Sequence, residues 1–322
     1  MENHTRYDGF ILLGFLIGHE AKILLATVLI AVYLLTIFGN TIIPIVIITH
    51  SRLHTPMYFF LGNLSVLDVA FSTVTVPSLL RTLLSGVKTI SFAGCMTQSY
   101  FYFFLGTLEY FLLTSMSYDR YVAICIPLHY SIIMNSRVCV QMVLVCCLGA
   151  FVSVLYPTIM ITRFSFCKSN VIDHFFCDSE PLLKLSCTDT RLLQIITFML
   201  SSIVILCSLV LTIISYIYIV SAILHIPRDA GRMKAFNTCA SHLTLFLMAT
   251  SVSVLLYVIP AEKSALGARK IPALLSSIVN PFLSPFVYTL RNDLVKEVLG
   301  AMFGRGKTIV VQKMGKWIVN RA

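Results

Sequence analysis

The chain alternates between long hydrophobic runs and short polar segments. Seven runs are almost free of charged residues and lie at 23–49, 57–80, 92–118, 138–162, 192–224, 235–259 and 271–290. A helix needs about 20 residues to cross a bilayer core roughly 30 Å thick, and each run reaches that length. Because lipid offers no partner to backbone groups, each span must be helical. The pattern predicts an all-α integral membrane protein, a bundle of seven transmembrane helices.

The segments between the runs are too short to form a separate soluble domain. We expect an N-terminal segment at 1–22, a seven-helix domain at 23–290 with one long loop at 163–191, and a tail at 291–322. In the tail, residues 292–303 place apolar side chains on one helical face, which predicts a short amphipathic eighth helix on the membrane surface.

An odd number of spans places the two chain ends on opposite sides of the membrane. Asn3 begins an Asn-His-Thr triplet, which is an acceptor pattern for glycosylation and favours an extracellular N-terminus. The tail is then cytoplasmic, and we expect a multi-pass protein of the plasma membrane.

Composition agrees with the pattern. The chain is 57% hydrophobic and 12% charged, whereas soluble domains carry about 25% charged residues. The formal charge of +10 is concentrated in the loops and tail assigned to the cytoplasm. We interpret it as a surface that faces anionic lipid and a protein partner, not nucleic acid.

Four of the ten cysteines fall in segments assigned to the outside, where disulfides persist. They are Cys95, Cys167, Cys177 and Cys187. Their spacing does not choose among the three pairings that four cysteines allow. A metal site is the alternative, but the tight pairs that are typical of zinc ligands are missing.

Two carboxylates lie deep within the predicted spans. Asp68 and Glu109 are each roughly 15 Å from the inner end of their helix, and Asn40 and Asn280 lie at a similar depth. Two carboxylates at one depth repel unless a cation or a proton joins them. A bound sodium ion or one protonated acid is therefore one interpretation, and a neutral hydrogen-bonded network between helices is the other.

Several local sequences resemble those of olfactory receptors, which are rhodopsin-like (class A) G-protein-coupled receptors. They are LHTPMYFFL at 53–61, SMSYDRYVAIC at 115–125, KAFNTCASHL at 234–243 and PFVYTLRN at 285–292. They occur at the right spans and in the right order, so the resemblance covers nearly the whole chain. It is similar to the larger, tetrapod-type subgroup.

The resemblance implies an odorant receptor that activates a heterotrimeric G protein of the stimulatory type and raises cyclic AMP. It implies the disulfides Cys95–Cys177 and Cys167–Cys187. It also implies a set of residues that rearrange on activation: Asp119, Arg120, Tyr121, Tyr216, His242, Ser284, Pro285 and Tyr288.

The chain departs from the family pattern at two places. Ser284 stands where the family usually has Asn, and we expect this to change the resting balance of the switch. Thr250 and Ser251 stand where the family commonly has Tyr-Gly, so the usual aromatic side chain at the pocket floor is missing.

The ligand site is expected in the outer half of the bundle, where residues at helical spacing share a face. The expected wall consists of Tyr102, Phe103, Gly106, Thr107, Tyr110, Leu200, Ile203, Thr250, Ser253, Val254, Tyr257 and Ser277. These positions carry hydroxyl groups but no acid or base. We therefore expect a small, neutral, mostly apolar volatile ligand, and neither an amine nor a carboxylate.

A transporter and a membrane enzyme are the rival classes. No inverted repeat supports a transporter, and neither H-E-x-x-H nor G-x-S-x-G supports an enzyme. The expected partners are an odorant, a G protein and the lipid bilayer, with no cofactor apart from sodium. The oligomeric state stays open.

Overall fold

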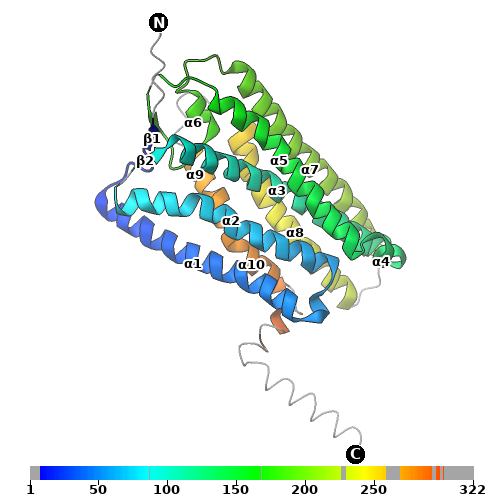
Figure 1. Ribbon diagram of the computed structural model, residues 1–322. Coiled ribbons are helices and arrows are strands. Elements are labelled where there is room, and N and C mark those ends of the chain that lie inside the picture. Colours follow the sequence, from blue (N-terminus) through cyan, green and yellow to red (C-terminus); the bar gives the residue numbers. More distant parts are fainter. Residues whose placement is uncertain are drawn as a thin grey trace, which may run out of the picture.

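The computed structural model describes residues 8–86, 88–167, 169–225, 230–258, 269–291, 295–297 and 300, with the backbone alone at 230–238, 241, 258 and 288–291. Asn3 and most of the expected eighth helix lie outside these residues. Long helices run side by side in one bundle, as predicted (Figure 1).

Seven helical segments build the bundle in the described part of the chain. They are α1 (His19–Thr49), α2 (Pro56–Leu84), α3 (Phe92–Cys125), α5 (Ser136–Thr162), α7 (Arg191–His225), α8 (Ala230–Ser253) extended by the π-helix η3 (Val254–Val258), and α9 (Lys270–Leu274) extended by the π-helix η6 (Leu275–Val279) and α10 (Asn280–Arg291). Short helices η1 (Ser51–Leu53), η2 (Pro127–His129), α4 (Tyr130–Ile133) and α6 (Ser179–Leu183) lie in the connections.

Five of these segments are long and apolar enough to cross a membrane: α1, α2, α5, α7 and Lys270–Val287. His242–Tyr257 is a shorter apolar helix. α3 is long enough, with 34 residues, but it carries Gln98, Glu109 and Asp119. Its polar residues are tolerated because α3 packs against α2, α5 and α7 instead of facing outward.

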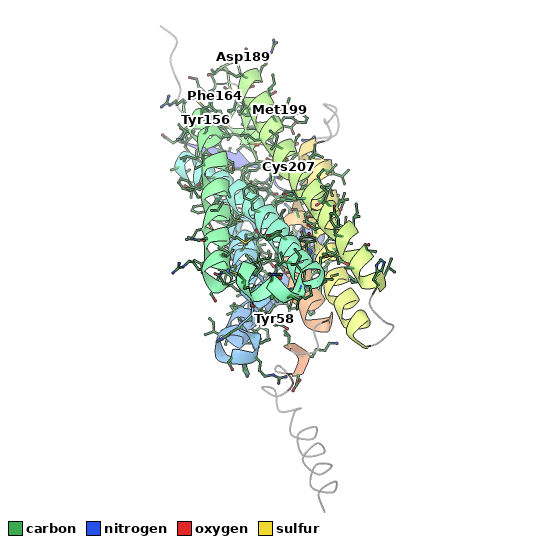
Figure 2. All side chains as sticks on the ribbon, turned by 90° about the vertical axis from the view of Figure 1, so that its right-hand side faces the viewer. Tyr58, Tyr156, Phe164, Asp189, Met199 and Cys207 are labelled. Carbon is green, nitrogen blue, oxygen red and sulfur yellow. A yellow bond between two sulfur atoms is a disulfide. The ribbon has the colours of Figure 1, made fainter. Side chains whose placement is uncertain are left out.

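The outward faces of α1, α5 and α7 are apolar. Leu144 on α5 is 62% exposed and Met199 on α7 is 52% exposed. Figure 2 shows Met199 and Cys207 along the outside of α7. Apolar exposure over whole helix faces is unfavourable in water and favourable in lipid, so these faces are suited to acyl chains.

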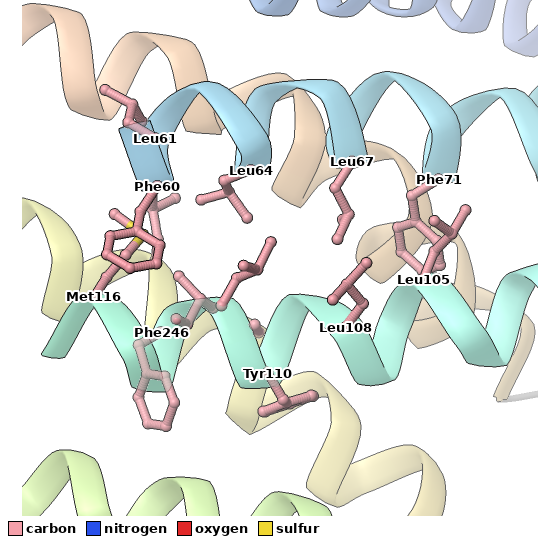
Figure 3. Packing of buried hydrophobic residues seen from close by; sticks show 14 of the residues in the cluster. Phe60, Leu61, Leu64, Leu67, Phe71, Leu105, Leu108, Tyr110, Met116 and Phe246 are labelled. Carbon is pink, nitrogen blue, oxygen red and sulfur yellow. The ribbon is translucent and has the colours of Figure 1, made fainter. Parts of the chain in front are cut away.

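The core lies mainly between α2 and α3. Phe60, Leu64 and Phe71 of α2 are fully buried, and Leu112 and Leu113 of α3 are 1% exposed. Figure 3 shows side chains of α2, such as Leu67 and Phe71, facing Leu105 and Leu108 of α3, with Phe246 of α8 on the other side of α3. This packing fixes α3 in the middle of the bundle.

A three-stranded sheet covers one end of the bundle, and the sequence analysis did not predict it. β1 (Gly9–Leu12) lies between β2 (Thr89–Ser91), to which it is antiparallel, and β3 (Val171–Ile172), to which it is parallel. A Cβ at Gly9 would lie 2.4 Å from the Ile90 carbonyl oxygen, so only glycine fits there. We call β1–β3 and the loop 163–190 the lid.

Two disulfides and a hydrogen-bond chain hold the lid. Cys95 of α3 is bonded to Cys177, and Cys167 to Cys187. Gln98 accepts a hydrogen bond from the Cys177 backbone N–H at 3.1 Å and donates to the Val74 carbonyl at 2.9 Å. The lid is therefore attached to α3 and, through Gln98, to α2.

We expect Cys95→Ser to reduce surface expression or ligand response strongly. The bond spans 82 residues, and closing a loop of that size stabilises a fold by about 4 kcal/mol. Flow cytometry and a cyclic-AMP reporter measure the two effects. Cys207→Ser is the control, because Cys207 is an exposed free thiol on α7; equal behaviour of the two variants would contradict a supporting role for the bridge.

Candidate functional site

Asp119 and Arg120 form a closed pair at the inner end of α3. Arg120 Nε donates to Asp119 Oδ2 at 2.9 Å, and a terminal guanidinium nitrogen donates to the same oxygen. Tyr130 donates to Asp119 Oδ1 at 2.8 Å. Both carboxylate oxygens are thus occupied, and the guanidinium is held against its own helix. Burial and the neighbouring Asp119 raise the pKa of Tyr130, so this phenol stays a donor.

His242 joins three helices close to this pair. Its Nε2 lies 2.9 Å from the Leu113 carbonyl of α3, and its Nδ1 lies 2.8 Å from the Tyr216 hydroxyl of α7. A carbonyl can only accept, so Nε2 carries the proton, and Nδ1 of the neutral ring accepts from Tyr216. The Tyr216 hydroxyl is also 3.0 Å from the Cys239 carbonyl. Tyr216 therefore has two acceptors for one proton.

The remaining predicted switch residues lie in different parts of the bundle. The Tyr121 ring is 5.9 Å from that of Tyr218. Ser284 is buried, and its Oγ has no hydrogen-bond partner in the part of the chain that the structure describes. Pro285 packs against Gly39 of α1, where a Cβ would come within 3.0 Å of the proline ring. The side chain of Tyr288 lies outside the described residues.

The four predicted midplane residues are all buried. Asn40 donates to the carbonyl of Pro281 at 2.8 Å, which joins α1 to α10. Asp68 lies within electrostatic range of Glu109 and close to Ser284. Five buried polar atoms of this layer have no hydrogen-bond partner among the described residues: Asn40 Oδ1, Ser65 Oγ, Asp68 Oδ2, Asn280 Nδ2 and Ser284 Oγ. The described residues alone therefore do not complete a neutral network.

A cavity of about 60 Å³ lies in the bundle between α3, α7, α8 and η6. Seven predicted wall residues line it, namely Tyr102, Phe103, Gly106, Thr107, Tyr110, Ser253 and Tyr257. The Tyr257 hydroxyl donates to that of Tyr102 at 3.3 Å. All five wall residues expected from α3 thus line this cavity, and Glu109 of the same helix lines it as well.

Five expected wall residues do not line this cavity. Ile203 is 57% exposed on the outside of α7, where Ser201 and Val204 face inward instead. Ser277 is replaced by Ser276, because η6 is a π-helix and its wider turn rotates the face by about one residue. Val254 begins the other π-helix, η3. Leu200 lines a second cavity, and Thr250 is buried without reaching either.

The second cavity, of about 380 Å³, adjoins the first and shares Phe103, Thr107, Ser201, Val204 and Tyr257 with it. It extends between α3, α5 and α7 toward α6 of the lid. At its outer end Glu180 pairs with Lys184 at 2.9 Å and with Arg269.

Ionisable side chains line the two cavities in addition to the expected wall residues, which carry none. Glu109 lines the first cavity, and Glu180, Lys184 and Arg269 line the second. The sequence analysis assigned Glu109 to the midplane layer alone. It missed the other three because they come from the long loop and the outer end of α9, which helical spacing does not place.

Comparison with known proteins decides the family. The family model described as olfactory receptor matches residues 29–305. Olfactory receptor 6J1 of Homo sapiens is 53% identical over 305 residues, covering 95% of this chain and 88% of the relative. Olfactory receptor 6T1 of Homo sapiens is 46% identical over 97% of both chains, and olfactory receptor 1468 of Rattus norvegicus is 44% identical over 92% of this chain and 95% of the relative.

The chain belongs to the olfactory receptor family. The family match confirms the resemblance drawn from the short sequences. Olfactory receptors are G-protein-coupled receptors of the plasma membrane, not enzymes. Family membership supports a seven-helix bundle, although only five of the described helices are long and apolar enough to cross a membrane by themselves.

The lid of this olfactory receptor contains two buried ionisable side chains in loop 163–190. His174 is 2% exposed, and neither ring nitrogen has a hydrogen-bond partner among the described residues. Burial, together with nearby Lys270, lowers its pKa to about 3. Burial, and then Glu180, raises the pKa of Asp178 to about 6, despite Arg269 nearby. Lys270 fastens the lid to α9, because its Nζ donates to Gly14 O at 3.0 Å and to Asp173 at 2.6 Å.

These two pKa values predict opposite responses of the lid to acid. In a detached loop His174 would be protonated near pH 6.5, whereas the docked lid keeps it neutral. Acidification to about pH 5 therefore makes the free energy of docking the lid less favourable by about 2 kcal/mol. Asp178 binds its proton more tightly in the docked lid, so the same acidification makes the free energy of docking more favourable by about 1 kcal/mol.

Hydrogen exchange of residues 171–178 in the purified receptor at pH 7.5 and 5 measures the response. In the unchanged receptor acid should lower the protection of the lid slightly. In His174→Phe acid should raise it, because only Asp178 responds, and in Asp178→Asn acid should lower it further. Identical pH responses in all three proteins would contradict these assignments.

Proposed function

We propose that this receptor binds a small, mostly apolar volatile molecule in the two adjoining cavities and activates a heterotrimeric G protein of the stimulatory type, which raises cyclic AMP. The affinity for the ligand differs between the resting and the active arrangement of the helices, and this difference drives activation. The cavities are lined largely by aromatic and aliphatic side chains with a few hydroxyls, which suits such ligands.

One observation carries this proposal: a single continuous helix bears both sites. α3 contributes Tyr102, Phe103 and Tyr110 to the cavity wall and Asp119 and Arg120 to its inner end. A shift of α3 under a bound ligand acts directly on the Leu113 carbonyl that holds His242. Release of Arg120 from Asp119 would then free the guanidinium for the backbone carbonyls of a protein partner.

The proposed orientation is an extracellular N-terminus, glycosylated at Asn3, and a cytoplasmic tail. The lid and its disulfides then lie outside the cell, where disulfides persist. In the described part of the tail, Val295 is buried and Glu297 pairs with Arg52 at 3.5 Å. These contacts support an eighth helix returning beneath α2.

A sodium ion is proposed to bind in the midplane layer. Carboxylate, amide and hydroxyl oxygens are suitable ligands for a hard cation, and Asp68, Ser65 and Asn40 each present one without a hydrogen-bond partner. The positive charge would relieve the repulsion between Asp68 and Glu109.

We expect Arg120→Ala to lower ligand-driven cyclic-AMP output to less than roughly a tenth, with surface expression retained, because the guanidinium is the group that a partner would contact. Arg137→Ala is the matched control, since Arg137 is a basic, exposed residue of α5 near the same end. Normal output from Arg120→Ala would remove this residue from coupling.

Asp68→Asn should change basal activity or its dependence on sodium, because the substitution removes one of two neighbouring carboxylates. Basal cyclic AMP is measured with sodium and with an equal concentration of a large organic cation outside the cells. If neither basal output nor its sodium dependence changes, Asp68 acts only in joining helices.

A further inference from the structure

A further cavity lies toward the inner end of the bundle, where α3, α5 and α7 meet. Its volume is about 420 Å³, within the range of sites that hold small molecules. Tyr118 of α3 is 43% exposed and Tyr218 of α7 is 57% exposed where they line it. The cavity is therefore a groove on the outside of the bundle, and in a membrane it opens to lipid. We call it the inner groove.

The inner groove lies where the inner leaflet meets the cytoplasm in the proposed orientation. Tyr118 is seven residues before Cys125, the last residue of α3, and Tyr218 is seven residues before His225, the last residue of α7. At 1.5 Å per residue, both tyrosines lie roughly 10 Å from the inner ends of their helices. Tyrosine is enriched at the level of the lipid polar groups, so this end of the groove suits the polar end of an amphiphile.

Three tyrosine rings form the inner part of the groove. The centre of the Tyr121 ring is 6.4 Å from that of Tyr118 and 5.9 Å from that of Tyr218. None of the three hydroxyls has a hydrogen-bond partner among the described residues. A tyrosine hydroxyl that is taken out of water usually finds a partner, so an occupant that brings a hydroxyl of its own fits this end of the groove.

The rest of the groove runs along α3 and α7 toward the bilayer midplane and offers no hydrogen-bond donor. Thr114 lies four residues from Tyr118, about 6 Å farther into the membrane, and Leu211 and Ile214 line the groove on α7. The hydroxyls of Thr114 and Ser215 donate to carbonyls of their own helices. The groove therefore suits a molecule with one small polar end and a long apolar body.

We propose that the inner groove binds a sterol of the inner leaflet, with its hydroxyl among the three tyrosines and its fused rings along Thr114, Leu211 and Ile214. A fused ring system is rigid, so it loses little conformational freedom on binding, whereas an acyl chain loses many rotamers. The described residues that line the groove carry no charge. They therefore offer a phospholipid phosphate no ionic partner, but they do offer partners to a hydroxyl.

Tyr121 connects the inner groove to the activation switch. It lines the groove and also packs against the buried cluster that contains Tyr216, Ile219 and Cys239. Tyr216 in turn holds His242. A sterol in the groove thus contacts a side chain that packs on the switch, and its binding does not depend on the odorant cavities, because no described residue lines both.

Photochemical labelling of the full-length receptor in phosphatidylcholine nanodiscs tests this proposal. A photoreactive cholesterol and, separately, a photoreactive phosphatidylcholine are the probes, and mass spectrometry locates the label. We expect the cholesterol probe to label residues 114–121 and 211–218. Excess cholesterol should remove this label, whereas excess cholesteryl methyl ether, which has no hydroxyl to donate, should leave most of it.

Three results would overturn the proposal. They are label spread evenly over all spans, label that excess cholesterol does not displace, and equal labelling of the groove by the phosphatidylcholine probe, which would show that an acyl chain fills it. Equal displacement by cholesterol and its methyl ether would overturn the assigned place of the hydroxyl.

Variants locate the site. Tyr118→Phe combined with Tyr218→Phe should lower the displaceable label to roughly a third, because the rings stay and two hydroxyls go; the matched control is Tyr156→Phe, an exposed tyrosine of α5 outside the groove (Figure 2). Ser215→Trp should lower the label to less than roughly a tenth, because the indole fills the groove. Its control is Leu144→Trp on the exposed face of α5. Unchanged label in Ser215→Trp would contradict binding in this groove.

Discussion

Inside a bilayer a polar side chain must find its partner within the protein, and this constraint determines how α3 is built. α3 carries Gln98, Glu109 and Asp119 along its length, and packing against three neighbouring helices keeps all of them away from lipid. Gln98 and Asp119 have hydrogen-bond partners near the two ends of the helix. Glu109, between them, lines the first cavity.

The same constraint explains why the sites are stacked along one helix. A buried polar side chain that exchanges one hydrogen-bond partner for another can change the packing of its helix. Each polar position of α3 is therefore a position where a change of partner affects the helix. The lid contacts its outer end, the cavity its upper half, the midplane layer its centre and the Asp119–Arg120 pair its inner end. Rigid packing against α2 lets these positions influence one another.

The spans were predictable because run length and hydrophobicity alone decide which segments cross a membrane. The α3 wall of the cavity was predictable for a related reason, since Phe103, Gly106, Thr107 and Tyr110 follow a regular helix. The prediction of wall residues failed where a helix departs from regular α-helical spacing. The π-helical turn of η6 brings Ser276 to the wall in place of Ser277.

The lid was out of reach for a different reason. β1 has only four residues, and its partners lie about 80 and 160 residues away in the chain, so no local pattern marks it as a strand. Resemblance to the family supplied the disulfide pairs, which spacing could not choose. The charged end of the second cavity was likewise missed, because Glu180 and Arg269 meet only in three dimensions.

The place of β1 at the centre of its sheet has a consequence for biosynthesis. The ribosome makes this strand before any helix, yet β3, one of its two neighbours, emerges only after four spans have been inserted. One edge of β1 can pair with β2 once α1 and α2 have been made, but its other edge has no strand to pair with until β3 follows four spans, and contacts so distant in sequence form slowly. We therefore expect the pairing of β1 with β3 to be a late step in maturation of the receptor, and a step at which quality control in the secretory pathway acts.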